Sequence, residues 1–401
     1  MPKKNCPVCG GSDILATTQI EDMPIYCNVL HDTYEQAINA PKGDIKLGFC
    51  QSCGHIYNYA FDASLMDYTV EYENSLHYSK RFNEYAKQLA KRLVSKFELY
   101  NKNILEIGCG KGDFLEMLCS EGNNTGYGFD KSYDPNRVNQ DAYPHITFIK
   151  DFYSEKYRDY NADLVCCRHV LEHIEQPSGF LSQLRKAIEF NNDKAAIYFE
   201  VPNALFTFED LGIWDLIYEH CSYFTPQSLI TAFTKSDYKI LEISEAFGCQ
   251  FLSLEATIKD SNEYGQVTEE PLTSKFKDLK ALRETVAAFD DKYQSAITLW
   301  RNKLMSFRHH NEQRIVVWGG GSKGVTFLNA MSANDKIIKY IVDVNPHKQN
   351  KFVPGTGQKV ISPVFLLEYK PDYILIMNAI YHNEIANMLN EINVQANIIC
   401  V

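Results

Sequence analysis

The chain has 401 residues, of which 45% are hydrophobic and 23% are charged, and its formal net charge is −11. These proportions are typical of a soluble globular protein, and the length predicts two or three domains rather than one core. The acidic balance argues against a general nucleic-acid-binding or anionic-membrane surface. Because no apolar signal segment and no membrane-spanning run is present, we expect a cytoplasmic protein whose 12 cysteines stay reduced.

Residues 1–60 contain two short cysteine motifs of the form Cys-x-x-Cys-Gly. Two such pairs can place four thiolates around one tetrahedral zinc ion, and the glycine after each pair lets the chain turn back. Cys27 and His31, between the motifs, are alternative ligands, but the symmetry of the pairs favours the motif cysteines. A closed site of this kind is structural. The predicted zinc ligands are Cys6, Cys9, Cys50 and Cys53.

Residues 67–79 are rich in aromatic and hydroxyl side chains, and apolar residues at helical spacing over 82–94 then predict an amphipathic helix. We expect the polar-aromatic stretch to lie over the mouth of the next domain. Tyr72, Ser75 and Ser79 are therefore candidates for contact with a cofactor or substrate, and the alternative is an ordinary surface loop.

Residues 103–115, NILEIGCGKGDFL, predict a buried strand, a glycine turn and the start of a helix. The spacing of Gly108, Gly110 and Gly112 differs from the G-x-G-x-x-G of dinucleotide sites. Glu106 would repel a pyrophosphate, but its carboxylate suits a cationic ligand. The E-x-G-x-G-x-G pattern resembles the first motif of class I S-adenosylmethionine (SAM) methyltransferases, whose ligand carries a sulfonium and an ammonium. The alternative is a plain tight turn.

Later strands of this region end in residues that suit the rest of such a ligand. Asp130 ends a short strand about 20 residues after the glycines, as a ribose-binding acid does. Asp151 and Phe152 follow the next strand and suit an adenine amino group and ring face. The R-H-V-L-E-H-I run after the fourth strand resembles a methyltransferase motif, which implies that His169 lies near the ligand. For His173 we expect hydrogen bonding at a helix start.

A second candidate site follows the fifth strand, 195–203. Glu219 and His220 are adjacent amid aromatic residues, and histidine is the side chain best suited to move a proton near neutral pH. A nearby carboxylate can raise its basicity. The alternative is that this segment only leads into a helix capped by Thr225, but that does not explain the Glu-His pair.

The C-terminal third reads as a connector and a further domain. Residues 270–310 step by three or four apolar positions, which predicts one long helix that packs along both domains or pairs with itself in a dimer. Residues 319–324 match G-x-G-x-x-G after a strand, and the strand 341–343 ends in an acid. We expect a second doubly wound sheet over 311–401 that binds a mononucleotide rather than NAD.

The cysteine motifs, the SAM-type region and the C-terminal run VWGGGSKG…VDVNPHKQ…VPGTG together resemble the sugar C-methyltransferase family, including enzymes of the tetronitrose type that act on a dTDP-4-keto sugar. The resemblance implies an α/β protein with a zinc module over 1–60 and a Rossmann-like SAM domain over 61–265. A connecting helix over 266–310 and a Rossmann-like domain over 311–401, which helps to hold the nucleotide-sugar, complete the chain.

The resemblance also implies roles for single residues. The E-H-x-S-Y-F segment matches the family segment whose histidine, here His220, is the proposed base that forms an enolate. The family run Y-H-E-H is Ile217-Tyr218-Glu219-His220 in this chain, so its first two residues differ. The other catalytic candidates are Glu219, Tyr223 and Tyr72. The cofactor candidates are Glu106, Gly108, Gly110, Gly112, Asp130, Asp151, Phe152, His169, Tyr72 and Ser75. The substrate candidates are Tyr218, Ser222, Asn203, Gly321, Ser322, Lys323 and Asp343.

We therefore expect a monomeric or homodimeric enzyme that transfers a methyl group from SAM to a nucleotide-linked 4-keto sugar. An O- or N-methyltransferase acting on another small metabolite is the main alternative. An RNA methyltransferase is disfavoured by the charge of −11 and by the lack of a basic stripe beside the cysteine motifs. A SAM-binding protein without activity is the remaining alternative.

Overall fold

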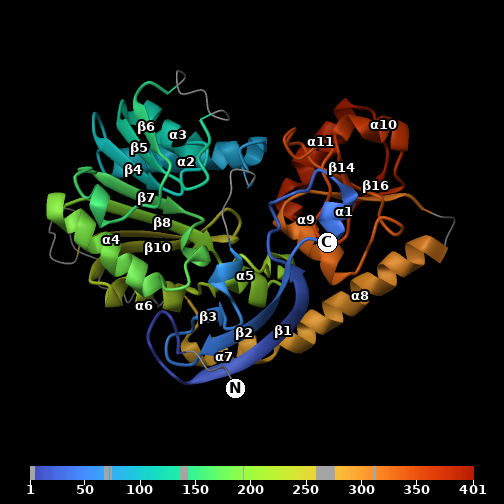
Figure 1. Ribbon diagram of the computed structural model, residues 1–401, viewed down its shortest axis with the longest axis horizontal. Coiled ribbons are helices and arrows are strands. Elements are labelled where there is room, and N and C mark those ends of the chain that lie inside the picture. The colour runs from blue at the N-terminus through green and yellow to red at the C-terminus, as the bar shows by residue number, and fades with distance from the viewer. Residues whose placement is uncertain are drawn as a thin grey trace.

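The computed structural model describes residues 5–66, 72, 75–135, 143–192, 194–258, 276–309 and 313–401. The described strands form sheets of four, seven and five strands. In Figure 1 the seven-stranded and five-stranded sheets lie in separate lobes, and the N-terminal strands and α8 run beneath them from one lobe to the other. No helix within these described ranges combines the length and the apolar character needed to cross a membrane.

The N-terminal sheet is antiparallel and borrows its last strand from a distant part of the chain. Ile56 pairs with Tyr223, and Tyr57 pairs with Ser222. The segment that the sequence singled out around His220 therefore ends as an edge strand of this sheet. The sheet consists of β1 (Ile14–Pro24), β2 (Lys42–Cys50), β3 (Ile56–Asn58) and β9 (Ser222–Tyr223), and α1 (Tyr34–Ile38) and η1 (Ala63–Leu65) accompany it.

The seven-stranded sheet has the order β6-β5-β4-β7-β8-β11-β10, with β11 antiparallel to its neighbours. Its strands alternate: Ile104 packs with α2 and α3 on one face, and Leu105 packs with α4 and α6 on the other. The strands are β4 (Asn103–Ile107), β5 (Thr125–Phe129), β6 (Ile146–Ile149), β7 (Leu164–Arg168), β8 (Ala196–Pro202), β10 (Tyr238–Ala246) and β11 (Phe251–Ile258).

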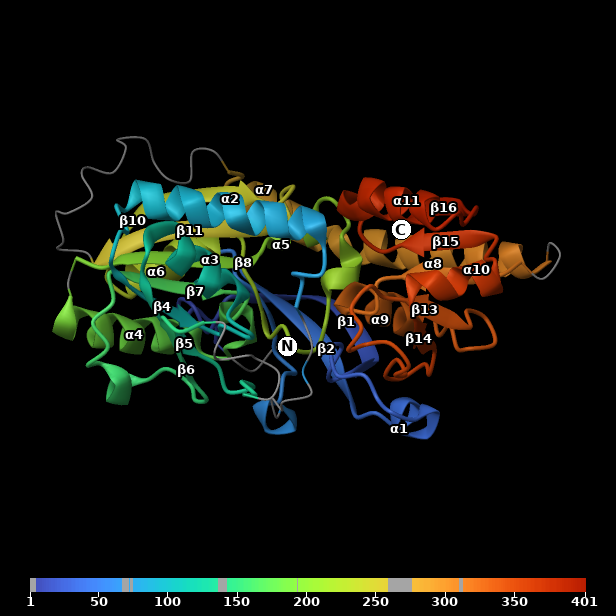
Figure 2. The ribbon, with the colours of Figure 1, turned by 90° about the horizontal axis from the view of Figure 1, so that it is seen from above.

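Helices cover both faces of this sheet, and Figure 2 shows α2 along its upper side. The predicted amphipathic helix over 82–94 lies within α2, whose buried face includes Phe82, Leu89 and Leu93. The helices are α2 (Lys80–Lys96), α3 (Asp113–Gly122), α4 (Pro177–Asn191), α5 (Ala204–Phe208) and α6 (Pro226–Lys235), with the 3-10 turns η3 (Glu155–Tyr157), η4 (Leu171–His173) and η5 (Ile213–Asp215).

The C-terminal domain is the predicted second doubly wound unit. Its five strands are all parallel, in the order β14-β13-β12-β15-β16. The strands are β12 (Ile315–Trp318), β13 (Tyr340–Val342), β14 (Lys359–Ile361), β15 (Tyr373–Ile376) and β16 (Asn397–Cys400). The helices are α9 (Ser322–Ala330), α10 (Leu366–Tyr369) and α11 (His382–Glu391), with η6 (Pro363–Phe365) and η7 (Ala379–Tyr381).

The prediction of one long connecting helix is wrong, because two helices stand there: α7 (Leu279–Ala287) and α8 (Phe289–His309). The chain leaves α7 at Ala288, and the fully buried Phe289 then packs against Phe208, with the ring centroids 4.4 Å apart. Apolar periodicity continues across the break, so it does not reveal it. The predicted part of this helix over 270–275 lies outside the described residues.

The N-terminal sheet, the segment 204–223, α7, α8 and the C-terminal domain share one apolar core. The VPGTG run takes part in this packing rather than facing a cavity. Phe352 forms a β-bridge with His31, and the amide of Gly355 donates to the carbonyl of Ala37 in α1 at 2.8 Å. The bounds 1–60, 61–265, 266–310 and 311–401 stay predictions.

Candidate active site

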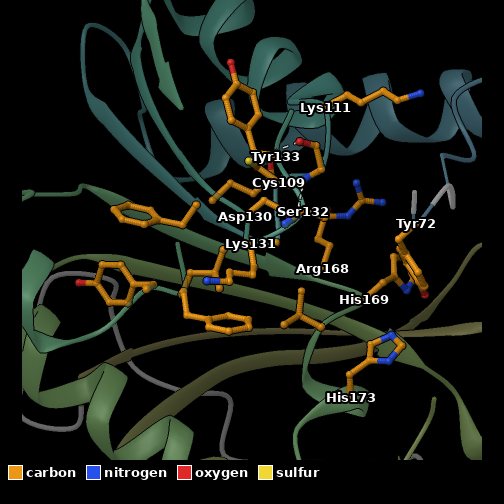
Figure 3. A pocket seen from close by; sticks show the side chains of 18 of the residues that line it. Tyr72, Cys109, Lys111, Asp130, Lys131, Ser132, Tyr133, Arg168, His169 and His173 are labelled. Carbon is orange, nitrogen blue, oxygen red and sulfur yellow. Dashed lines mark hydrogen bonds between the residues drawn. The ribbon is translucent and has the colours of Figure 1, made fainter. Parts of the chain in front are cut away.

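A cavity of about 640 Å³ lies at the carboxyl ends of β4, β5, β6 and β7, and Figure 3 shows side chains from the loops after these strands around it. Cavities of this size hold small ligands. Residues from the start of α2 and the segment before it close another side. The predicted cofactor residues that line the cavity are Tyr72, Ser75, Glu106, Gly108, Gly110, Asp130, Asp151, Phe152 and His169.

Gly110 gives the glycine turn an open face. Its φ is +56°, and a Cβ built there would meet nothing within 4 Å. Its amide donates to Asp130 Oδ2 at 2.8 Å, and Asp130 Oδ1 accepts from the amide and hydroxyl of Ser132 at 2.7 and 2.6 Å. The acid at the end of β5 thus holds the glycine turn while its carboxylate lies on the cavity wall.

Gly112, which was also predicted to contact the cofactor, is not among the cavity-lining residues. It is the N-cap of α3 with φ +84°, and a Cβ there would come within 2.5 Å of the Phe148 ring. Gly112 therefore permits a turn and a close packing contact instead of an approach by a ligand.

Glu106 is buried in the cavity wall, with 4% of its surface exposed. Its Oε2 has no hydrogen-bond partner within the described ranges. Burial raises the pKa of this carboxyl to about 8, against the opposing attraction of Arg168. A cationic ligand would restore the favourable interaction that water no longer provides, as the sequence predicted for this position.

Arg168 and His169 are held by a buried carboxylate that the sequence did not suggest. Arg168 donates through Nε and Nη2 to Glu200 Oε1 at 3.0 and 2.7 Å, and His169 Nε2 lies 3.0 Å from the same oxygen. The hydroxyls of Tyr85 and Tyr198 donate to Glu200 Oε2. Burial opposes ionisation, but Arg168, His169 and Tyr85 together hold the pKa of Glu200 far below its usual range. This network fixes the cavity wall after β7.

At the other end of the cavity, Asp151 is a fixed acceptor. Hydrogen bonds from Lys156, Tyr157 and the amide of Phe152 lower the pKa of Asp151 to about 2. The Phe152 ring is 62% exposed and so is free of core packing. An anionic acceptor beside an exposed ring suits an amino-substituted aromatic base.

His220 does not line the cavity, but its ring centroid is 4.9 Å from that of His173, which does. These two imidazoles and Glu172 bring one ligand-type atom each within 4.8 Å of the others. His173 Nδ1 lies 2.9 Å from the carbonyl oxygen of Glu219. The expected helix-start role for His173 therefore understated its position, which joins the cavity to the His220 segment.

Both imidazoles are held neutral. Burial lowers the pKa of His173 to about 4, and burial also lowers the pKa of His220 well below its usual value, with contributions from the nearby His173, His169 and Lys323. A neutral imidazole is able to accept a proton. Burial also raises the pKa of Glu172 to about 8.

Glu219 does not direct its carboxylate as an orienting partner of His220 would. Its Oε2 accepts the amide of Cys27 at 3.0 Å, and the hydroxyl of Tyr72 and the charge of Lys348 also act on it. Burial raises the pKa of this carboxyl to about 7. Glu219 therefore faces the meeting point of the N-terminal sheet and the C-terminal domain, which we call the domain junction.

The hydroxyls of two tyrosines that were predicted to act in catalysis or to contact the substrate are hydrogen-bonded to backbone groups. The Tyr223 hydroxyl donates to the carbonyl of Ile217 at 3.0 Å and accepts the amide of the same residue at 3.2 Å. The Tyr218 hydroxyl accepts the amide of Asp62 at 3.0 Å, and its ring packs against Phe61. Tyr223 closes its own loop and Tyr218 anchors the loop to the N-terminal module, so neither role is supported.

Ser222 and Asn203, which were predicted to contact the substrate, are both buried. Ser222 is buried within β9. Asn203 is 2% exposed, and its side chain caps α5 and donates to Glu245 and to the carbonyl of Cys249. Asn203 thus satisfies buried backbone groups, whereas the Ser222 hydroxyl is buried without a hydrogen-bond partner among the described residues.

The C-terminal glycine loop repeats the arrangement at Asp130. Asp343 Oδ2 accepts the amide of Gly320 at 2.8 Å, and its Oδ1 accepts the amide of Asn345 at 2.8 Å. Lys348, with 7% of its side chain exposed, lies 4.0 Å from Asp343 and beside Gly321. Ser322 begins α9 at this loop.

Lys323 connects the glycine loop to the rest of the domain junction. It pairs with Asp215 of η5, and its charge helps to lower the pKa of His220. The start of α9 therefore lies near the histidine pair.

The four motif cysteines come together as predicted. Cys6 Sγ lies 3.6 Å from Cys53 Sγ, and Cys9 Sγ lies 3.5 Å from Cys50 Sγ. All four sulfur atoms lie within 4.8 Å of one another, which fits a tetrahedral zinc with Zn–S bonds of about 2.3 Å. The cluster packs against the core of the seven-stranded sheet.

Comparisons with known proteins agree with this geometry. A model of a methyltransferase domain matches residues 78–243, and a model of a C-methyltransferase C-terminal domain matches residues 253–400. No curated protein matches the chain.

Solved structures that match part of the chain include the magnesium protoporphyrin IX methyltransferase of Synechocystis PCC 6803 with bound S-adenosylhomocysteine (SAH) (18% identity, 44% of this chain and 83% of that chain, TM-score 0.35). Another is a SAM-dependent methyltransferase of Aquifex aeolicus (15% identity, 44% and 98%, TM-score 0.34).

The fold, the glycine turn and the methyltransferase model define a class I SAM-dependent methyltransferase. The match of residues 253–400 to the C-methyltransferase C-terminal domain supports a C-methyltransferase family. The cavity fits SAM: Glu106 offers an unpartnered carboxylate oxygen to a cation, and Gly110 leaves the turn open.

The two glycines at opposite sides of this turn predict different defects. In Gly112→Ala the new Cβ clashes with Phe148, so we expect a loss of stability on the order of 1–3 kcal/mol with SAH affinity changed less. In Gly110→Ala the Cβ projects into the cavity, so we expect a larger loss of SAH binding free energy than of unfolding free energy. Thermal unfolding and calorimetric SAH titration measure both, and equal defects in the two variants would contradict the assignment.

The raised pKa of Glu106 predicts pH-dependent binding. The free carboxyl, with its pKa at about 8, loses its proton when a cation binds beside it. SAH, which carries an ammonium group, should therefore bind more tightly as pH rises from about 6 to about 8, with proton release in calorimetry. Glu106→Gln should flatten this trend. The same slope in the variant would assign the titration to another group.

Proposed function

We propose that the protein methylates a carbon of a nucleotide-linked 4-keto sugar, with His220 as the base that forms an enolate. The observation that supports this most is the position of the neutral His173–His220 pair between the SAM cavity and the glycine loop of the C-terminal domain. A base placed there would reach a substrate that lies across the domain junction.

The cavity residues hold the methyl donor. Glu106 would accept the cationic amino-acid end, Asp130 the ribose, and Asp151 and Phe152 the adenine. SAM, when bound, supplies an electrophilic methyl group. The remaining work of the site is to orient the substrate carbon and to remove its proton, and holding two reactants in line contributes as much as a base or more.

His220 would remove the proton α to the ketone. Its lowered pKa keeps it unprotonated before the reaction. Since the Tyr223 hydroxyl is occupied by backbone, the donor to the enolate oxygen would be Tyr72, whose hydroxyl would exchange its contact with Glu219 for one with the substrate. Tyr72 lines the cavity, and its hydroxyl lies 3.5 Å from the side-chain nitrogen of Asn28.

The domain junction supplies what a sugar diphosphate needs. The N-terminus of α9 offers amide groups after Gly321, and Lys348 is buried beside it. Lys323 and Ser322 lie in the first turn of the same helix. These donors support a diphosphate site, while Asp343 orients the loop as Asp130 does in the SAM cavity.

We also propose that the four cysteines hold a structural zinc ion. The second motif ends immediately before β3, the strand that pairs with β9. Zinc would therefore stabilise the sheet that carries the His220 segment, without an open coordination position for catalysis.

The role of His220 can be tested by substitution. His220→Asn should reduce turnover of a 4-keto sugar nucleotide by about 10²–10⁴-fold while SAH still binds, because only the base is lost. In D₂O the wild-type enzyme should exchange the proton α to the ketone, and the variant should not. His382→Asn, in the C-terminal helix α11, is the matched control.

Near-normal turnover and exchange in His220→Asn would remove His220 from the role of base. Methylation of the same substrate without any exchange would instead favour O- or N-methylation, which needs no carbanion.

The proposed zinc site can be tested by removing one of its ligands. Native mass spectrometry should find one zinc per chain, and Cys50→Ser should lose the metal and several kcal/mol of stability, because a buried ligand is removed. Cys400→Ser, at an exposed cysteine, should retain both. A wild-type protein purified without a metal and with unchanged stability in Cys50→Ser would contradict the proposal.

A further inference from the structure

The N-terminus of α2 is capped from another domain. Glu384 of α11 accepts the Ser79 hydroxyl at 2.7 Å, the Lys80 amide at 3.0 Å and the Arg81 amide at 3.2 Å. Figure 2 shows this end of α2 beside α11. Three hydrogen bonds to one carboxylate satisfy donors that a helix terminus otherwise leaves unpaired.

The sequence of α2 makes this cap necessary. Its first turn contains no acid and begins with two basic residues, Lys80 and Arg81, at the positive end of the helix dipole. Ser79 caps the amide of Phe82, but the third helical position, where a local capping box has Glu or Gln, is Phe82. Glu384 supplies across domains the carboxylate that the helix lacks.

The capped turn holds the wall of the SAM cavity. We call residues 75–79, which lead into α2, the entry segment; Ser75 and His77 of this segment line the cavity, as does Phe82. His77 Nδ1 lies 2.9 Å from Asn83 Oδ1 of α2, and the side-chain amide of Asn83 donates to the carbonyls of His77 and Ser79.

The same helix reaches the other wall of the cavity. Tyr85, one turn further along α2, donates to Glu200, which holds Arg168 and His169. The start of α2 therefore determines two parts of the cavity.

We propose that Glu384 is a positioning residue for SAM binding: by capping α2 it sets the entry segment against the cavity, so that the C-terminal domain contributes to methyl-donor affinity. The inference rests on SAM binding and not on the identity of the methylated substrate. A second contact is consistent with this coupling, since the Tyr78 ring of the entry segment lies 6.4 Å from the ring of His347 in the C-terminal domain.

The contact between Gln250 and Asn378 provides a control. Their side-chain amides exchange two hydrogen bonds, at 3.1 and 2.7 Å, and join the C-terminal domain to β11 without touching the entry segment. Losing this pair weakens the same domain interface but leaves the cap of α2 in place.

The test is calorimetric SAH titration of the full-length protein and of Glu384→Gln, which keeps the shape of the side chain and removes its charge. We expect SAH affinity to fall about five-fold, which corresponds to a helix cap of about 1 kcal/mol. Hydrogen exchange at the amides of residues 80–82 should become faster. Glu391→Gln, an exposed acid on the same helix, should change neither, and Gln250→Ala should lower stability only.

An SAH affinity within two-fold of wild type in folded Glu384→Gln would overturn the proposal, as would an equal loss in Gln250→Ala. If Glu384→Gln does not fold, Glu384→Asp, which keeps the charge but shortens its reach, gives the same comparison. The titration uses no sugar substrate, so its failure is distinct from failure of the proposed methylation.

Discussion

The pairing of β9 with β3 is the contact on which the candidate chemistry depends. The SAM cavity lies at the carboxyl ends of strands of the seven-stranded sheet, but His220 enters that neighbourhood from a loop that ends in β9. Only two residues of β9 pair, and they pair with a strand that begins three residues after Cys53. A tetrahedral metal there would fix the start of β3, and through it the end of the loop. Tyr223, with both hydrogen bonds to Ile217, then closes the loop on itself.

A second constraint is that buried carboxylates need hydrogen-bond or charge partners. Both Rossmann-like domains end a strand in an aspartate whose carboxylate accepts the amide of a glycine loop, Asp130 with Gly110 and Asp343 with Gly320. The acid thereby orders the loop at the point where a ligand approaches. Glu106 differs from these aspartates, because its Oε2 is buried without a hydrogen-bond partner among the described residues. A bound cation would stabilise the charge of such a carboxylate.

Much of this site was predictable from the spacing of residues that are close in the sequence. Glycines at fixed offsets and acids at strand ends predicted Glu106, Gly110, Asp130 and Asp151, because the chemistry of each is set by neighbours close in sequence. The four cysteines were predictable for the same reason.

Contacts between distant parts of the chain were not predictable in this way. The cap of α2 by Glu384 and the placement of Lys348 at the domain junction join separate domains and leave no periodic signal. The backbone bonds of the Tyr218 and Tyr223 hydroxyls were not predictable either, because in sequence such a tyrosine looks like one that faces a substrate.

The charges of the domain junction bear on which ligand it accepts. Lys323 is neutralised by Asp215, which leaves Lys348 between Asp343 and Glu219. If both acids were ionised, the junction would repel an anion. Burial raises the pKa of Glu219 to about 7, so near neutral pH a large share of this carboxyl is protonated and Lys348 keeps charge for a phosphate. The burial of Glu219 among three parts of the chain is thus what makes an anionic substrate compatible with a junction that contains three acids.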